Sequence, residues 1–111
     1  NLVRTQLASS LRAVVCQQLI PDKTGGRALA YELMLMTHAI KANIREGKTH
    51  QILSTMQVGQ KVGMQTMEAT LVALITEGMI TLGEARTRMP GSEVLAAMAA
   101  QAAKAHQEAA R

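Results

Sequence analysis

The chain contains a short apolar run, Val14-Val15-Cys16-Gln17-Gln18-Leu19-Ile20, which ends at the turn sequence Pro21-Asp22-Lys23-Thr24-Gly25-Gly26. A second run follows, in which alternate residues form an apolar face: Leu29, Tyr31, Leu33 and Leu35. Two apolar runs around a six-residue turn rich in Pro, Asp and Gly predict a β-hairpin. The opposite face of the second run is also mostly apolar, so we expect both faces to be covered in a larger structure.

Helical spacing dominates outside this hairpin. Residues 2–14 carry apolar side chains at helical intervals and predict a first helix. From Thr37 onward the pattern predicts only helices, and the first of these covers 38–46 between a Thr37 cap and Gly47. Its expected buried residues are Ala39, Ile40 and Ile44.

Each later helix has its own start or stop signal. The expected caps are Thr49, Thr81 and Ser92, and the expected stops are Gly59, Gly78 and Pro90. The expected inward residues are Ile52, Leu53 and Met56, then Met67, Leu71, Leu74 and Ile75, and finally Val94, Leu95 and Met98. The alanine-rich end has high helix propensity but little to bury, so we expect it to fray or to pack on a neighbour.

Together these patterns predict a mainly α (α+β) fold, with an N-terminal helix and β-hairpin followed by a bundle of about five short helices. Three segments are expected: 1–36 with the first helix and hairpin, 37–91 with the helical domain, and 92–111 as an alanine-rich helix or frayed tail. The 111 residues suit one small domain. The sequence begins at Asn1 without a methionine, which we expect of a segment of a longer protein.

Composition narrows the possible functions. The formal charge is +4, and all of it lies in residues 1–50. One tyrosine, with no Phe or Trp, counts against base-stacking modes of nucleic-acid binding. A single cysteine indicates a reducing compartment, and no apolar run reaches the roughly 20 residues of a membrane helix.

No motif in the chain predicts catalysis, cofactor binding or a metal site. Gly47-Lys48-Thr49 lacks the glycine five positions earlier that a phosphate-binding P-loop needs, because that position is Ala42. His38, His50 and His106 lack zinc-ligand spacing. Ser9-Ser10 has no histidine and carboxylate placed to activate it. Met64, beside Gly59 and Gly63, is instead an interface candidate, because flexible thioethers suit adaptable contacts.

The segment Thr37-His38-Ala39-Ile40-Lys41-Ala42-Asn43-Ile44-Arg45-Glu46-Gly47-Lys48 resembles the retraction motif of PilT-type twitching-motility ATPases, which runs Thr-Pro-Ala-Ile-Arg-Asn-Leu-Ile-Arg-Glu. Other segments resemble the family in the same order: 7–14 and 17–21 the end of its RecA-like core, 26–32 its last strand, and 49–52 and 63–67 its C-terminal helices. The resemblance covers residues 1–90 in collinear order. The four departures in the motif are His38, Lys41, Ala42 and Asn43.

This resemblance implies the C-terminal part of a hexameric secretion-type ATPase, with residues 1–36 as the end of the RecA-like core. The Walker motifs would precede Asn1, so ATP and Mg²⁺ are cofactors of the parent and none is expected in this fragment. The implied partners are neighbouring subunits and inner-membrane platform or secretion-complex proteins, without direct nucleic acid. The implied location is cytoplasmic, peripheral to the bacterial inner membrane. The candidate coupling residues are Thr37, Ala39, Ile40, Lys41, Ile44, Arg45, Glu46, Lys48 and Met64.

The hairpin connection distinguishes branches of this family. Assembly-type relatives usually carry a four-cysteine zinc module between these strands, whereas the connection here has six residues and no cysteine. The resemblance therefore favours the PilT-like branch, which includes type IVB secretion and conjugation ATPases. Two other functions stay open: a stand-alone helical module that binds nucleic acid through its basic half, and an adaptor that dimerises through its methionine faces and alanine-rich tail.

Overall fold

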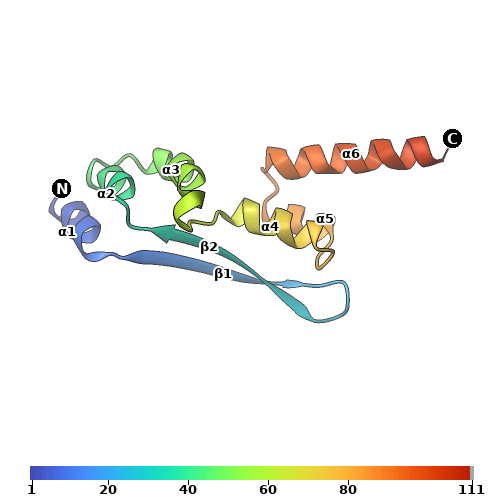
Figure 1. The fold of residues 1–111 in the computed structure, drawn as a ribbon, viewed down its shortest axis with the longest axis horizontal. Coiled ribbons are helices and arrows are strands. Elements are labelled where there is room, and N and C mark those ends of the chain that lie inside the picture. Colours follow the sequence, from blue (N-terminus) through green and yellow to red (C-terminus); the bar gives the residue numbers. More distant parts are fainter. Residues whose placement is uncertain (111) are drawn as a thin grey trace. The chain divides into compact units, whose positions relative to one another are not determined.

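The computed structural model describes residues 1–110 and confirms the predicted fold class (Figure 1). A helix and a two-stranded hairpin precede a series of short helices, and the bounds of all elements follow. They are α1 Leu2–Ser10, β1 Ala13–Pro21, β2 Arg27–Leu35, α2 His38–Arg45, the 3₁₀ turn η1 Thr49–Gln51, α3 Ile52–Val58, the 3₁₀ turn η2 Gly59–Val62, α4 Met67–Thr76, α5 Leu82–Arg88 and α6 Glu93–Ala109. None of the helices within residues 1–110 has the length and apolar character needed to cross a membrane.

The hairpin closes on a turn organised by Asp22. Its carboxylate accepts hydrogen bonds from the Thr24 amide and hydroxyl, both at 2.9 Å, and from the Gly26 amide at 2.8 Å. The Asp22 amide donates to the Gly26 carbonyl oxygen, and the Met36 amide to the Arg12 carbonyl oxygen, each at 3.0 Å. These two bonds fix the antiparallel register at the two ends of the ladder.

The two faces of the hairpin differ in burial. Ile20, Ala28 and Ala30, all even-numbered, are buried, whereas four large odd-numbered side chains are exposed: Val15, Leu19, Leu29 and Tyr31. The odd-numbered Leu33 and Leu35, at the end of β2 that is far from the turn, are partly buried. Because successive side chains of a strand point to opposite faces, the buried residues Ile20, Ala28 and Ala30 share one face and the exposed residues Leu19 and Leu29 lie on the other. In the part of the hairpin next to the turn, the face with the bulkier side chains is therefore the uncovered one.

Packing divides the chain into two compact units. Unit 1 comprises Asn1–Gln18 and Tyr31–Met67, and unit 2 comprises Leu19–Ala30 and the chain from Glu68 onward. Each unit contains part of the hairpin and helices that follow it, and unit 1 also contains α1, which precedes the hairpin. This grouping differs from the three sequence segments 1–36, 37–91 and 92–111, because the strands are long enough to serve two sets of helices.

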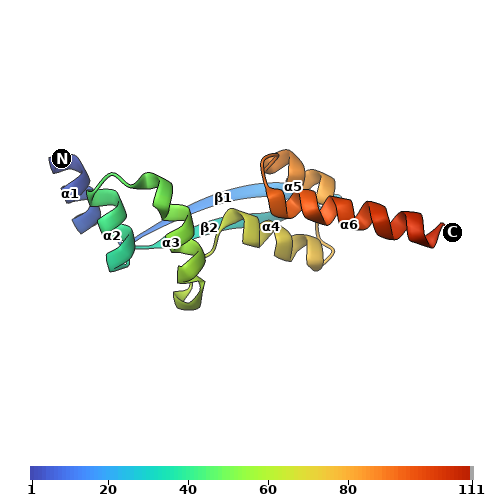
Figure 2. The same cartoon turned by 90° about the horizontal axis from the view of Figure 1, so that it is seen from above.

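The core of unit 1 is rich in methionine. Ile40, Met56 and Met64 are buried together, and partly buried side chains pack around them: Met34, Leu35, Met36, Ile44 and Ile52. Figures 1 and 2 show α1 beside α2 in this unit. A short antiparallel bridge joins Leu33 to Gln65, with N···O distances of 2.8 and 2.9 Å. It fixes the segment that carries Met64 against β2.

Unit 2 is closed by well-capped helices. The Glu84 amide donates to the Thr81 hydroxyl at 3.1 Å, and the Leu95 amide to the Ser92 hydroxyl at 3.2 Å. The Ser92 hydroxyl also donates to Glu68 at 2.7 Å, which ties the start of α6 to α4. The predicted caps Thr81 and Ser92 are thus confirmed, and the predicted apolar stripe of α4 is buried at Met67, Leu71 and Leu74.

Two sequence predictions about helix ends are wrong. The first helix ends at Ser10 rather than at residue 14, because the β-branched Val14 and Val15 pair in β1. Its only buried residue is Ala8. Thr49 does not cap a helix through its side chain, because the chain first makes the 3₁₀ turn η1.

Three residues expected inside are exposed, namely Ala39, Leu53 and Val94, since each lies just off the buried stripe that its helix turns towards the core. The last helix runs unbroken to Ala109. Its residues from 100 to 110 are all exposed, in line with the few large apolar side chains available there.

Candidate partner-contact site on helix α2

Helix α2 is fixed at both ends by local signals. The Ile40 amide donates to the Thr37 hydroxyl at 3.4 Å, which confirms Thr37 as the N-cap. At the other end Gly47 adopts a φ of +70°, a conformation that glycine takes at little cost. The Lys48 amide then donates to the Asn43 carbonyl oxygen at 2.8 Å. The sequence Gly47-Lys48-Thr49 is therefore a helix end followed by a 3₁₀ turn.

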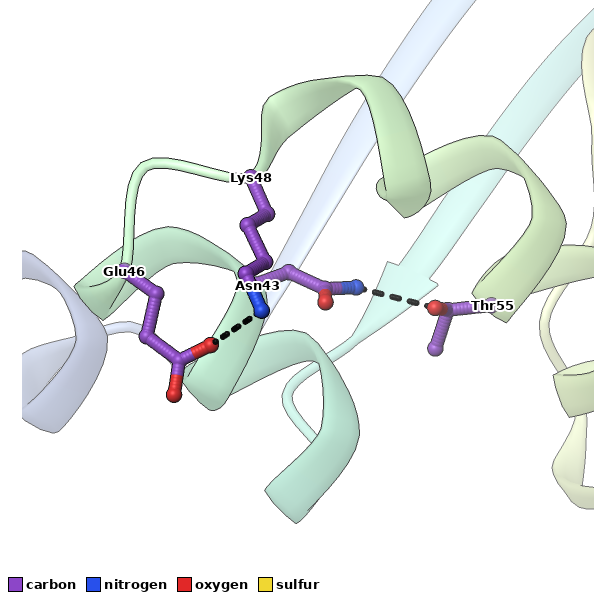
Figure 3. Close-up of polar contacts among 4 residues, drawn as sticks. All are labelled: Asn43, Glu46, Lys48 and Thr55. Carbon is purple, nitrogen blue, oxygen red and sulfur yellow. Dashed lines mark hydrogen bonds and ion pairs between the residues drawn. The ribbon is translucent and has the colours of Figure 1, made fainter.

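The inner face of α2 attaches it to α3. Ile40 is completely buried against Met56 and Met64, and Ile44 is partly buried beside them. Asn43 is buried as well, and its side-chain amide donates to the Thr55 hydroxyl at 2.9 Å (Figure 3). The Thr55 hydroxyl in turn donates to the Gln51 carbonyl oxygen at 2.9 Å. This chain of hydrogen bonds holds α2 and α3 in one arrangement.

The outer face of α2 and the residues after it carry charge. Arg45 is exposed and Lys41 is half-buried. Lys48 and Glu46 form an ion pair of 3.3 Å, in which both side chains are about half exposed (Figure 3). An exposed pair of this kind contributes about 0–1 kcal/mol, so it orients the two side chains without stabilising the fold appreciably.

A cation from α1 lies over the C-terminal end of α2. A Cβ atom placed on Gly47 would come within 2.6 Å of Nη1 of Arg4, so the guanidinium occupies the space that a side chain would need. The last turn of a helix carries partial negative charge on its free carbonyl groups, which favours a nearby cation. Glycine is required here both for its φ and for this close approach.

The sequence-based candidates fall into three groups. Thr37, Ile40 and Ile44 hold the helix in place, whereas Ala39, Lys41, Arg45, Glu46 and Lys48 are exposed or half-buried. Met64 is only 2% exposed and contacts the position where a Cβ on Gly59 would sit, at 2.8 Å from the Met64 sulfur. Met64 is thus a core residue in this structure. The absence of a side chain at Gly59 makes room for it.

Sequence reasoning missed two residues that shape the site, Asn43 and Arg4. Asn43 lies three positions after Ile40, on the same side of the helix, and this spacing is the only signal that could have indicated its burial. No local pattern links Arg4 to Gly47. Within residues 1–110, no three His, Cys, Asp or Glu side chains gather as metal ligands, and Cys16 is an exposed free thiol.

The fold and the site define a helical module on a β-hairpin, with one helix held from inside and charged outside. Curated relatives share this segment. An uncharacterised Escherichia coli protein, YggR, is 47% identical over 78 residues, which are 70% of this chain and 24% of that protein. The type IV pilus retraction ATPase PilT of Pseudomonas aeruginosa is 41% identical over 87 residues, or 78% of this chain and 25% of PilT.

Solved structures agree. The pilus retraction motor PilT with bound ADP has a TM-score of 0.67 and 41% identity, covering 83% of this chain and 24% of that one. The Legionella pneumophila ATPase DotB shares the fold, with a TM-score of 0.61 at 16% identity over 81% of this chain and 24% of its own. No family model matches the chain. The chain belongs to the PilT-like pilus and secretion ATPases and spans about a quarter of the length of these relatives.

Proposed function

We propose that the chain serves as the C-terminal helical region of a hexameric PilT-like ATPase and that α2 passes ATP-driven motion to a neighbouring subunit or to the secretion machine. The observation that carries this proposal is the construction of α2. Its inner face is fixed by Ile40 and Asn43, while Lys41 and Arg45 remain available outside. A rigid element with a charged outer face suits the transfer of a rigid-body movement.

Exposed apolar residues support a larger parent protein. On α1, Leu2 and Val3 are 73% and 70% exposed, and one face of the hairpin exposes Leu19 and Leu29. Adjacent uncovered apolar side chains of this size are typical of a surface that another part of a protein covers. A RecA-like core preceding this segment would cover them, and it would also supply the sites for ATP and Mg²⁺.

The choice of machine rests on details of the hairpin and the helix. The connection between β1 and β2 is short and holds no cysteine, which favours the PilT-like branch over assembly-type ATPases. Within the motif, Asn43 stands where the retraction motif has leucine, and here it makes a buried bond to Thr55. The substitution thus alters the attachment of α2 to α3. Pilus retraction, type IVB secretion and conjugative transfer are the candidate processes, at the cytoplasmic side of the inner membrane.

The proposal predicts a P-loop encoded upstream of this segment in the same reading frame. The test uses the full-length protein and measures two quantities, the rate of ATP hydrolysis and the transport or motility that it drives. The double variant Lys41→Ala/Arg45→Ala is compared with the control Lys61→Ala, which removes an exposed cation from η2. We expect the double variant to lose transport much more than hydrolysis and the control to keep both. An upstream sequence without a P-loop, or equal loss of transport in the control, contradicts the proposal.

A further inference from the structure

A polar hollow lies in unit 1 between the end of α1 and the start of α2. It has a volume of about 430 Å³ and is lined by Ser9, Ser10, Leu11, Arg12, Met36 and Lys41. The Met36 amide donates to the Arg12 carbonyl oxygen at 3.0 Å, which holds these two parts of the lining together. The coupling role proposed for α2 does not use Ser9, Ser10 or Arg12.

The hollow holds two cations and no acid. Neither Arg12 nor Lys41 forms an ion pair with any residue of the described chain, in which the Lys48–Glu46 pair is the one salt bridge found. Unit 1 has just two acidic residues, Glu46 and Glu32. Glu46 is engaged with Lys48, and Glu32 lines a separate apolar hollow beside Met34 and Met56. The two cations are therefore uncompensated by protein groups.

Helix dipoles do not cancel this positive charge. The C-terminal end of α1 contributes about −0.5 of a charge to the hollow, and the N-terminal turn of α2, which includes Lys41, contributes about +0.5. These partial charges offset each other, since both helix ends border the same space. What remains is the field of the Arg12 guanidinium and the Lys41 ammonium.

The serine hydroxyls can join a ligand without leaving a polar group unpaired. Both donate to one acceptor, the Gln6 carbonyl oxygen, at 3.0 Å from Ser9 and 2.6 Å from Ser10. If one hydroxyl turns into the hollow, the other still occupies that oxygen. The hollow thus offers a planar fork from arginine, a mobile ammonium and one spare hydroxyl, the donor types that proteins use for phosphate oxygens.

We propose that this hollow is a binding site for a phosphate group, held between Arg12 and Lys41 with a hydroxyl from Ser9 or Ser10. The site shares Lys41 with the coupling surface proposed for α2 but depends also on Arg12 and the serines, and its test requires neither ATP hydrolysis nor an assembled machine. A free phosphate ion and the phosphate of a nucleotide share this chemistry, and the volume accommodates either source.

The test is a titration of the chain with inorganic phosphate at constant ionic strength, followed by backbone amide NMR. We expect saturable shifts at Ser10, Arg12 and Lys41. Arg12→Gln and Lys41→Gln should each weaken binding about tenfold, because each removes a charge-assisted hydrogen bond. Lys61→Gln removes the same charge from the same unit outside the hollow, and it should bind phosphate as the unmodified chain does.

Two parallel titrations identify the ligand. The two titrations use ADP and acetate. If ADP binds more tightly than phosphate and shifts the same amides, the site is assigned to a nucleotide phosphate. If ADP and phosphate bind with equal affinity, the site is assigned to the free phosphate ion. Acetate that binds as tightly as phosphate overturns the assignment to phosphate. Shifts that do not saturate would show general attraction of phosphate to a basic unit and would contradict the proposed site. The same conclusion follows if Lys61→Gln weakens phosphate binding as much as Arg12→Gln and Lys41→Gln do. Unchanged amide spectra of the variants outside the hollow would show that they remain folded.

Discussion

The two units of the chain differ most in charge. Unit 1 contains six Lys and Arg against two Glu and therefore holds the entire net charge of +4. Unit 2, counted in sequence from Leu19 to Ala30 and from Glu68 onward, has six residues of each sign. Both units share one hairpin, so they differ through the helices that each adds to it. The positive charge thus gathers on the unit that contains α2.

They also use polar side chains differently. In unit 2, Ser92 and Thr81 cap helices and Asp22 closes a turn, so each acts within four residues, and Ser92 also bonds to Glu68. In unit 1, the buried Asn43 bonds to a residue twelve positions away. Unit 2 therefore resembles a neutral, locally specified support. In unit 1, the buried amide of Asn43 holds α2 against α3, and Lys41 and Arg45 on α2 form no ion pair within the described chain.

The largest effect on stability is expected from creating a cavity in the core of either unit. Ile40→Ala in unit 1 and Leu71→Ala in unit 2 each remove a completely buried side chain, which should lower the free energy of unfolding by about 2–5 kcal/mol. Hydrogen exchange measured by mass spectrometry should show loss of protection mainly in the unit that carries the change. Val58→Ala, at a highly exposed position, is the control. Uniform loss of protection in both units would show that they unfold as one.

The buried amide of unit 1 should give the next largest effect. Asn43→Ala removes the bond to Thr55 and leaves a small void, so denaturant unfolding should show a loss of about 1–3 kcal/mol. Asn43→Leu/Thr55→Val replaces both partners with apolar groups and should recover much of this loss. If Asn43→Ala alone is neutral, the amide does not fix α2 on α3, and the contrast between the units weakens.

In unit 2, a comparison of two caps isolates the contribution of the bond between Ser92 and Glu68. Thr81→Ala removes a cap and should cost about 1 kcal/mol. Ser92→Ala removes a cap and the bond to Glu68, so it should cost about 2 kcal/mol in the same thermal or denaturant measurement. Equal costs for the two variants would mean that the Ser92–Glu68 bond contributes nothing.

The smallest effect concerns the hairpin turn and acid. The pKa of Asp22 is lowered, chiefly because the Thr24 hydroxyl donates to the carboxylate and also because backbone amides of Thr24 and Gly26 do. The carboxylate is ionised in its hydrogen-bonded form, so its contribution is present above the unperturbed pKa of 3.8 and is lost as the pH falls through the lowered value.

Acid titration of the Thr24 and Gly26 amides by NMR should therefore show a midpoint below 3.8, and Asp22→Asn should abolish that transition. A midpoint at or above 3.8 would mean that the turn does not favour the charged form of Asp22. Asp22 is only partly buried and acts within its own turn, so the change in overall stability should be slight.

Much of the fold could be predicted because its signals are short-range. The hairpin follows from two apolar runs around residues 21–26, and the caps Thr37, Thr81 and Ser92 each act on an amide three positions later. The same local reading failed at the end of the first helix. Val14 continues the helical spacing, but its pairing in β1 depends on a strand that comes later in the chain.

The candidate site was predictable only in part. Lys41 and Arg45 are four positions apart and share one side of α2, on which Arg45 is exposed and Lys41 is half-buried. Spacing could not distinguish Met64 as a core residue from Met64 as a contact residue, because a methionine beside glycines suits either. Its burial depends on the open space at Gly59 and on the bridge between Leu33 and Gln65.

The sequence by itself determined the hairpin, most helix ends and the resemblance to PilT-like ATPases, because these depend on residues close together in the chain. Tertiary structure decided which side chains meet: Asn43 with Thr55, Arg4 with Gly47, and Arg12 with Lys41 around one hollow. Each of these pairs joins separate elements, and its energy depends on packing that no local pattern specifies. Five of the seven Lys and Arg residues that the sequence places in residues 1–50 thereby belong to unit 1.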